Sequence, residues 1–171
     1  MLPDAPAETR FQETQRLGQN PIVRYIMFAE PVFIGLIFLV IGRSAGRGAW
    51  LPLLLAWGAM GVALPVLLSR LTMTTAVTDQ HLAIRWSRFY RKQIPLHAIT
   101  DAEPIRYDPI SMAGGWGIKY SRKLGLVLNV YGDRGVKVSA GDKRYLIGSQ
   151  KPDELAEAAL QGAIESSPAR Q

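Results

Sequence analysis

The sequence predicts a helical membrane hairpin followed by an all-β barrel or sandwich, which one C-terminal helix caps. Three observations support this prediction. Two apolar runs, Ile22–Ile41 and Ala49–Leu68, each have the length of about 20 residues that crosses a bilayer as a helix. Runs of alternating polar and apolar residues follow, and these are typical of half-buried strands. An amphipathic stretch that starts at Pro152 comes last.

The charge and the cysteine content limit the function classes. The 171 residues carry a formal net charge of +6 and include no cysteine, which excludes disulfides and thiol chemistry. A basic domain tethered beside a bilayer has an electrostatic partner in anionic lipid headgroups. Nucleic acid is not expected as a partner, because no recognised binding motif accompanies the positive charge.

Four segments are expected along the chain. Residues 1–20 are rich in Pro, Glu, Gln and Thr, which predicts a flexible N-terminal tail with a short interfacial helix around Thr9–Leu17. The membrane hairpin is expected at 21–70, the β domain at 71–165 and a loose C-terminus at 166–171. No cleavage site follows the first apolar run, so we expect no cleavable signal.

The link between the apolar runs, Gly42–Gly48, is too short to hold a folded domain. The two helices are therefore expected to run antiparallel, with residues equidistant from the link facing each other. The outer ends carry more arginines than the link does: Arg10, Arg16, Arg24 and Arg70 against Arg43 and Arg47. This bias predicts a multi-pass protein of the cell inner (plasma) membrane, with both termini cytoplasmic.

Glu30 lies inside the first apolar run, level with Trp57–Gly61 in an antiparallel pair. Charge at that depth costs about 2.5–3.5 kcal/mol. One interpretation is a proton or ion relay, or an oligomer contact. The other is a neutral carboxyl beside a kink at Pro31, hydrogen-bonded to the Trp57 indole, or a residue tilted toward the headgroups. Gly58 and Gly61 are expected to allow close approach of the helices.

Eight strands are expected after Arg70, separated by turn signals such as Thr78–Gln80 and Gly132–Gly135. The alternation is clear where Leu82 and Ile84 share one face. The expected strands are Thr72–Val77, His81–Trp86, Arg91–Leu96, Ile99–Ile105, Gly117–Ser121, Leu126–Val130, Val136–Ser139 and Arg144–Ile147. They are expected to form an antiparallel unit.

One helix is expected to close this unit. Pro152 suits a first helical turn, and Asp153 and Glu154 complement the positive end of the helix dipole. The expected apolar face consists of Leu155, Ala156, Ala159, Leu160, Ala163 and Ile164.

Three segments support a family resemblance. Met73–Trp86 contains a strand, an Asp turn and a second strand, Ile94–Ile99 contains an Ile-Pro step, and Tyr145–Leu155 contains a final strand, a Gly-Ser turn and a helix start. With the hairpin, they resemble the bacterial pleckstrin-homology-like (PH-like) membrane proteins over roughly Leu71–Ile164. The segment Asp108–Trp116 departs from a minimal version of that pattern. The resemblance implies a PH-like domain that binds or scaffolds, and it transfers no catalytic residue.

Cations and aromatics are interspersed in Arg85–Lys92, which makes this segment a candidate binding surface. We expect its cations to contact lipid phosphate or a partner, and its aromatics to lie at the interface. The alternative is a solvated hairpin tip. The candidate lipid- or partner-binding residues are Arg88, Phe89, Arg91, Lys92, Trp116, Arg122 and Lys123.

Trp116 lies in the glycine-rich string Gly114–Gly117, which has two interpretations. It is either the aromatic tip of a flexible loop or a ring packed under a turn that the glycines permit. Arg122 and Lys123 are expected to join the main cluster if their turn lies beside it.

Nothing in the sequence indicates catalysis. No nucleophile-elbow, Walker A or zinc-protease motif occurs, and His81 and His97 lack a third ligand, so we expect no enzyme, metal or cofactor. We expect a non-catalytic integral membrane protein whose cytoplasmic PH-like domain binds a protein partner or the anionic membrane surface. Alternatives are a structural subunit of a larger membrane complex, a homo-oligomer, or a transporter accessory that uses Glu30.

Overall fold

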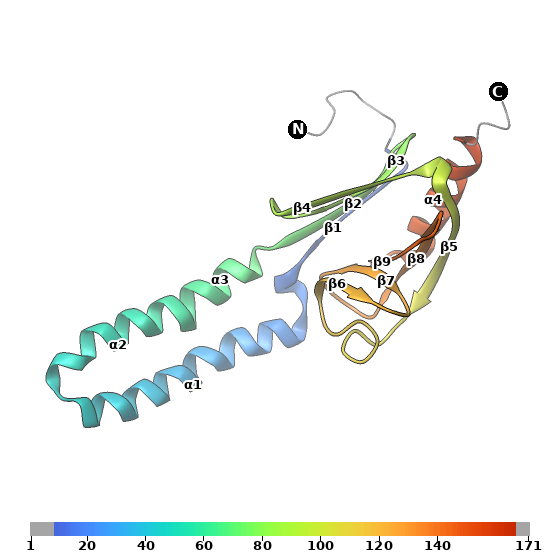
Figure 1. Cartoon of the computed structure of the whole chain (residues 1–171). Coiled ribbons are helices and arrows are strands. Elements are labelled where there is room, and N and C mark those ends of the chain that lie inside the picture. The colour runs from blue at the N-terminus through green and yellow to red at the C-terminus, as the bar shows by residue number, and fades with distance from the viewer. Residues whose placement is uncertain (1–8, 167–171) are drawn as a thin grey trace. The chain divides into compact units, whose positions relative to one another are not determined.

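The chain forms two compact units, which a computed structural model describes over residues 9–166 (Figure 1). One unit is the helical segment Arg16–Leu71. The other, called the β unit here, is built from chain on both sides of that segment, up to Gln15 and from Thr72 onward. Parts of the expected flexible tail (1–20) and of the expected loose C-terminus (166–171) lie outside the described residues, namely 1–8 and 167–171.

The first apolar run forms helix α1, Pro21–Ala45. The Asn20 side-chain oxygen accepts the backbone N–H groups of Ile22 and Val23 at 3.0 and 3.4 Å, which caps the helix start. The helix ends at Gly46, whose φ of +82° suits glycine. The link is therefore shorter than the expected Gly42–Gly48, because the helix continues past Gly42.

The second apolar run is one continuous helical segment, Trp50–Ser69. It consists of α2 (Trp50–Trp57), a π-helical stretch η3 (Gly58–Ala63) and α3 (Leu64–Ser69). The Leu64 N–H donates to the carbonyl of Ala59, five residues back. The wide turn ends next to Pro65, which has no N–H to donate to Gly61 and would clash with that carbonyl in a regular helix.

Both helical segments are long and apolar enough to cross a membrane. Only 6% and 11% of the residues in their most apolar windows are buried. Large side chains such as Tyr25, Phe28 and Leu51 are exposed along them. The core helix of a soluble protein would instead be covered by the rest of the chain.

The first sheet of the β unit has the order β1-β2-β3-β4. Its strands are β1 (Phe11–Arg16), β2 (Thr72–Val77), β3 (His81–Trp86) and β4 (Tyr90–Pro95). The prediction of a short helix at Thr9–Leu17 within a flexible tail is wrong, because Phe11–Arg16 is a strand. It is held there by side chains as well as by the sheet: Glu13 accepts hydrogen bonds from Ser149 Oγ at 2.5 Å and from the Gln150 N–H at 2.9 Å.

The second sheet has the order β5-β8-β9-β7-β6. Its strands are β5 (Ile99–Arg106), β6 (Gly117–Ser121), β7 (Gly125–Asn129), β8 (Arg134–Ala140) and β9 (Lys143–Gly148). The antiparallel prediction is wrong for one pair, since β7 and β9 run parallel. Strand β9 inserts between β7 and β8, and Gly125 allows this approach, because a Cβ there would lie 2.0 Å from the Arg144 carbonyl oxygen. Both sheets are open.

Helix α4, Pro152–Glu165, contacts β5, β8 and the short turn η4 (Leu96–Ala98) (Figure 1). Its buried face contains Leu155, Ala156, Ala158, Ala159 and Gly162. Ile164 was expected on this face but is 56% exposed. The helix lies so close to η4 that a Cβ on Gly162 would be 2.5 Å from Leu96 Cδ1. The buried stripe therefore runs through Gly162 instead of Ile164.

Candidate functional site

The turn between β3 and β4 holds the residues singled out by sequence. Ser87 has a φ of +49°, and it is the single non-glycine residue with positive φ among residues 9–166. Its N–H donates to the Thr72 carbonyl at 2.6 Å, and the Thr72 N–H donates to Ser87 Oγ at 2.9 Å. This turn is therefore fixed to the first residue of β2.

Arginines lie on the outer face of the first sheet beside this turn. Arg85 and Arg91 are directly opposite each other in the β3–β4 register, and both are exposed. Cβ atoms of such a pair are about 5 Å apart, and like charges at that distance repel. Neither residue has an acidic partner within the described chain. An external anion would relieve this repulsion.

The tip of the turn adds a third cation and an aromatic ring. Arg88 is exposed, and Phe89 has 80% of its surface exposed. A phenylalanine that extends into water from a turn fixed by three hydrogen bonds gains nothing from the fold itself. The ring is therefore available to contact an apolar surface or a membrane interface.

Lys92 does not lie on the same face of the sheet as Arg85 and Arg91. Strand alternation places it on the inner face with Ile84 opposite, whereas Arg91 points outward. Its Nζ lies 5.7 Å from the centre of the Tyr145 ring, which is a cation–π distance. The candidate cluster is therefore two surfaces, one outward with Arg85, Arg88 and Arg91, and one inward with Lys92.

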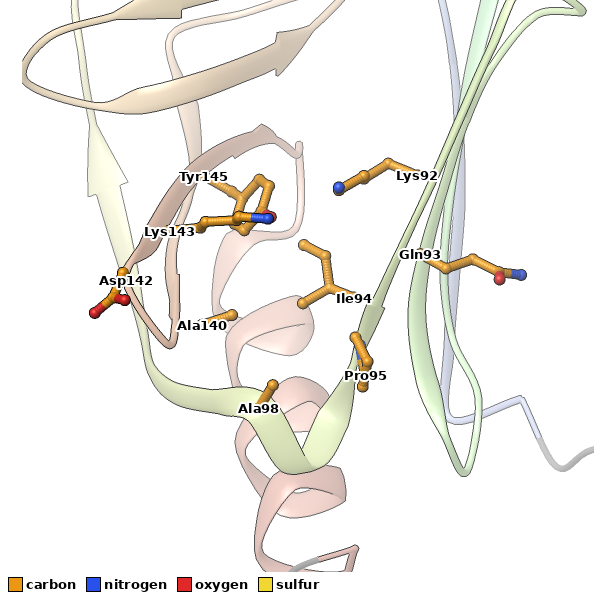
Figure 2. Close-up of a pocket in the computed structure, with 9 residues that line it drawn as sticks. All are labelled: Lys92, Gln93, Ile94, Pro95, Ala98, Ala140, Asp142, Lys143 and Tyr145. Carbon is orange, nitrogen blue, oxygen red and sulfur yellow. The ribbon is translucent and has the colours of Figure 1, made fainter.

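Figure 2 shows the inward surface, a cleft of about 300 Å³ where β4 faces the β8–β9 turn. Lys92 and Ile94 form one side, and Lys143 and the buried Tyr145 form the other. Asp142 lies at the rim, and Figure 2 shows its carboxylate directed away from Lys92. Sequence reasoning missed Lys143 and Tyr145, because alternation reveals a residue's face and gives no signal of the opposing strand.

Trp116 is half-buried, and its indole N–H donates to the Gly132 carbonyl at 3.3 Å. Gly114 and Gly115 have φ values of +71° and +104°, as a glycine-permitted turn requires. The structure therefore favours the packed ring over the free aromatic tip. At the start of this loop, hydrogen bonds from the backbone of Ser111 and Ile110 lower the pKa of Asp108.

Arg122 and Lys123 lie in the exposed β6–β7 turn of the second sheet. The β3–β4 turn belongs to the first sheet, so no strand pairing joins the two turns. The Arg122 carbonyl accepts a hydrogen bond from Arg144 Nη2 at 3.3 Å, which links their turn to β9.

Glu30 is half-buried in α1, and within the described chain it has no hydrogen bond or ion pair. The Trp57 indole was expected to reach it, but it donates instead to the Pro31 carbonyl at 2.8 Å. Gly61 allows close approach as expected, since a Cβ there would lie 3.4 Å from Pro31 Cα. Gly58 does not lie at a close approach, because a Cβ built on it would have no neighbouring atom within 4 Å.

Residues 9–166 contain no group of three potential metal ligands among His, Cys, Asp and Glu. Comparison with protein-family models, curated proteins and solved structures returns no match.

Proposed function

We propose that this chain is a non-catalytic integral membrane protein whose β unit binds the anionic surface of the bilayer that its hairpin spans. The hairpin crosses the cell inner membrane twice, with both termini cytoplasmic. The β unit acts as a PH-like module, in keeping with the resemblance to bacterial PH-like membrane proteins. Its contact with the bilayer is the outward surface of Arg85, Arg88, Phe89 and Arg91.

The exposed apolar surface of the hairpin supports membrane insertion. Contiguous exposed apolar patches larger than a few hundred Å² are rare on soluble monomers. Here they cover two helices of spanning length, with a single acidic residue, Glu30, between Arg16 and Leu71. Lipid hydrocarbon is the solvent that suits such a surface.

The hydrogen bonds between Ser87 and Thr72 are the observation that carries the proposal. Thr72 follows the last residue of α3, Ser69, by three positions, and three extended residues span at most about 10 Å. The covalent chain alone therefore keeps Ser87 within about 15 Å of the helix end, at any orientation of the β unit. In contrast, the β2–β3 turn lies at the far ends of two six-residue strands, about 20 Å along the sheet.

The charges at this turn are sufficient to orient the β unit. A Lys or Arg near an anionic membrane surface contributes about 1 kcal/mol, so Arg85, Arg88 and Arg91 together contribute about 3 kcal/mol. Full burial of Phe89 in the interface adds about 1.5–3 kcal/mol. Lipid phosphates would also offset the repulsion between Arg85 and Arg91.

A spin label at residue 89 tests the proposal in the full-length chain. Because the sequence has no cysteine, Phe89→Cys creates a unique labelling site. In nanodiscs of phosphatidylglycerol and phosphatidylcholine, we expect the label to gain oxygen accessibility and to lose accessibility to a water-soluble nickel complex. In pure phosphatidylcholine, we expect this change to be smaller.

Gln80→Cys in the β2–β3 turn is the matched control, since that residue is also exposed. We expect its label to stay in water in both lipid mixtures. Reversal of Arg85, Arg88 and Arg91 to glutamate should remove the lipid dependence at residue 89. Equal water accessibility at 89 and 80 in anionic nanodiscs contradicts the proposal.

A membrane complex assembled through Glu30 is the second candidate function. Its support is the half-buried, unpartnered carboxyl inside α1. The glycines that face the other helix are already used within the hairpin, so Glu30 is the polar group left for a partner helix. If this candidate holds, Glu30→Leu should abolish co-purification of a companion in mild detergent while membrane insertion is retained. Unchanged co-purification excludes this role.

A further inference from the structure

We infer that a cleft at the base of the hairpin binds one anionic phospholipid. The cleft has a volume of about 400 Å³ and lies entirely within the helical unit, where the start of α1 meets the end of α3. Arg16 and Arg24 line it together with Met27 and Phe28. The inference rests on the proposed membrane insertion but concerns a different site from the β3–β4 turn.

The backbone fixes the shape of this cleft. The Leu17 N–H donates to the Leu71 carbonyl at 2.9 Å, so the chain that enters the hairpin is joined to the chain that leaves it. Gly18 lies against the end of α3, and a Cβ on it would be 3.0 Å from the Ser69 carbonyl oxygen. A larger side chain at Gly18 would fill or widen the cleft.

The cleft is strongly basic. Arg16 and Arg24 are exposed, and neither has an acidic partner within the described chain. The helical unit contains one acidic residue, Glu30, which lies further along α1. Two guanidinium groups without a carboxylate match a phosphate group, which accepts bidentate hydrogen bonds from arginine.

An apolar wall follows the cations in the direction of the bilayer. Arg24 and Phe28 are four residues apart in α1, so they lie on one face one turn apart. Phe28 is 74% exposed, and Met27 lies beside it in the same cleft. The site is therefore cationic at the chain exit and apolar one turn deeper, which matches a phosphate joined to acyl chains. A free phosphate would use the cations alone.

Native mass spectrometry of the full-length protein in mild detergent tests the inference, with phosphatidylglycerol, phosphatidylcholine and glycerol phosphate as probes. We expect phosphatidylglycerol to bind at one site in preference to phosphatidylcholine. The double variant Arg16→Gln, Arg24→Gln should weaken this binding about tenfold or more, because each charged hydrogen bond is worth at least about 1.4 kcal/mol. Phe28→Ser should weaken the lipid as well.

The variant Arg43→Gln, Arg47→Gln is the matched control, since it removes the same charge at the other end of the hairpin. We expect it to bind phosphatidylglycerol like the wild type. Equal losses in both double variants indicate a nonspecific charge effect and overturn the inference. Displacement of the lipid by glycerol phosphate, with no effect of Phe28→Ser, overturns it in favour of a phosphate site.

The two proposals fail separately in these experiments. If the chain is not inserted in membranes, alkaline extraction releases it and both proposals are lost. A second outcome is that the chain is inserted and residue 89 enters the interface, but phosphatidylglycerol binds no more tightly than phosphatidylcholine. In that case only the lipid site is lost.

Discussion

The indole N–H of Trp57 donates a 2.8 Å hydrogen bond to the carbonyl of Pro31. This bond joins the two apolar helices away from their ends. The contact needs Gly35, because a Cβ there would lie 3.2 Å from the indole nitrogen. Gly35 and Trp57 are the same number of residues before and after Gly46, and so are Gly42 and Trp50. The expectation that equidistant residues face each other is confirmed for these pairs.

Trp57→Phe should weaken the hairpin by about 1 kcal/mol, since hydrogen bonds between membrane helices contribute about that much. An aromatic ring is kept, but phenylalanine lacks the N–H donor and is smaller than the indole, so a control that loses the same ring atoms is needed. Reversible unfolding of the helices in mixed micelles measures the change. Trp50→Phe is the control, because the Trp50 indole makes no hydrogen bond within the described chain, and an equal loss in both variants would contradict the prediction.

Gly42→Ala should destabilise the helix pair, because the new Cβ would lie 2.9–3.0 Å from three carbons of the Trp50 ring. Overpacking of this kind costs about 1–3 kcal/mol. Gly58→Ala is the matched change, since its Cβ position is open, and it should be neutral. The same micelle unfolding assay compares the two, and equal effects of both variants would show that the ring does not lie over Gly42.

The sequence predicted the bounds of β2, β3 and β6 to the residue, because alternation and turn residues are local signals. It missed β1, whose inward positions are Phe11, Glu13 and Gln15. Two of these three side chains are polar, so the strand has no apolar alternation. Their hydrogen-bond partners come from the end of β9 and the turn that follows it, more than 130 residues away.

The site was predictable only to the extent that it is local. The outward surface of Arg85, Arg88 and Arg91 follows from a strand–turn–strand pattern. The inward position of Lys92 follows from the same alternation, but its contact with Tyr145 depends on how two sheets meet. The basic cleft joins residues around Arg16 to residues around Ser69, which only the closed hairpin brings together.

Glu13→Ala should lower the free energy of unfolding of the β unit by about 2–4 kcal/mol. The change leaves the buried Ser149 hydroxyl and the Gln150 N–H without their carboxylate acceptor, and charged hydrogen bonds contribute about 1.5–3 kcal/mol each. Urea unfolding of the full-length protein in micelles, followed by near-UV circular dichroism, measures this. Gln12→Ala on the exposed neighbour should be neutral, and a neutral Glu13→Ala would mean that β1 is not held by this carboxylate.

Asn129→Ala should cost about 3 kcal/mol in the same urea assay. The buried Asn129 amide donates to the Tyr107 hydroxyl at 3.0 Å and accepts the Gly117 N–H at 3.0 Å. Its loss leaves these groups unsatisfied, at about 1–3 kcal/mol each. Tyr107→Phe removes a single hydrogen-bond partner and should cost about 1 kcal/mol. An Asn129→Ala variant as stable as Tyr107→Phe would contradict a network in which Asn129 joins Tyr107 to Gly117.

Alkaline pH should destabilise the β unit through Tyr107. Burial raises the pKa of the Tyr107 phenol, and the hydrogen bond from Asn129 offsets this only in part. The folded state therefore favours the neutral phenol. Its stabilising contribution is complete below the unfolded pKa of about 10 and is lost as pH rises toward the folded pKa.

Tyr107→Phe isolates this contribution, because the variant has no phenol to ionise. We expect the difference in unfolding free energy between the wild type and Tyr107→Phe to shrink as the pH rises from about 8 to about 11. Urea unfolding of both full-length proteins in micelles at each pH measures it. Other tyrosines and lysines titrate in both proteins, so their effects cancel in the difference. A difference that stays constant over this range would show that the phenol is as free to ionise in the folded chain as in the unfolded one.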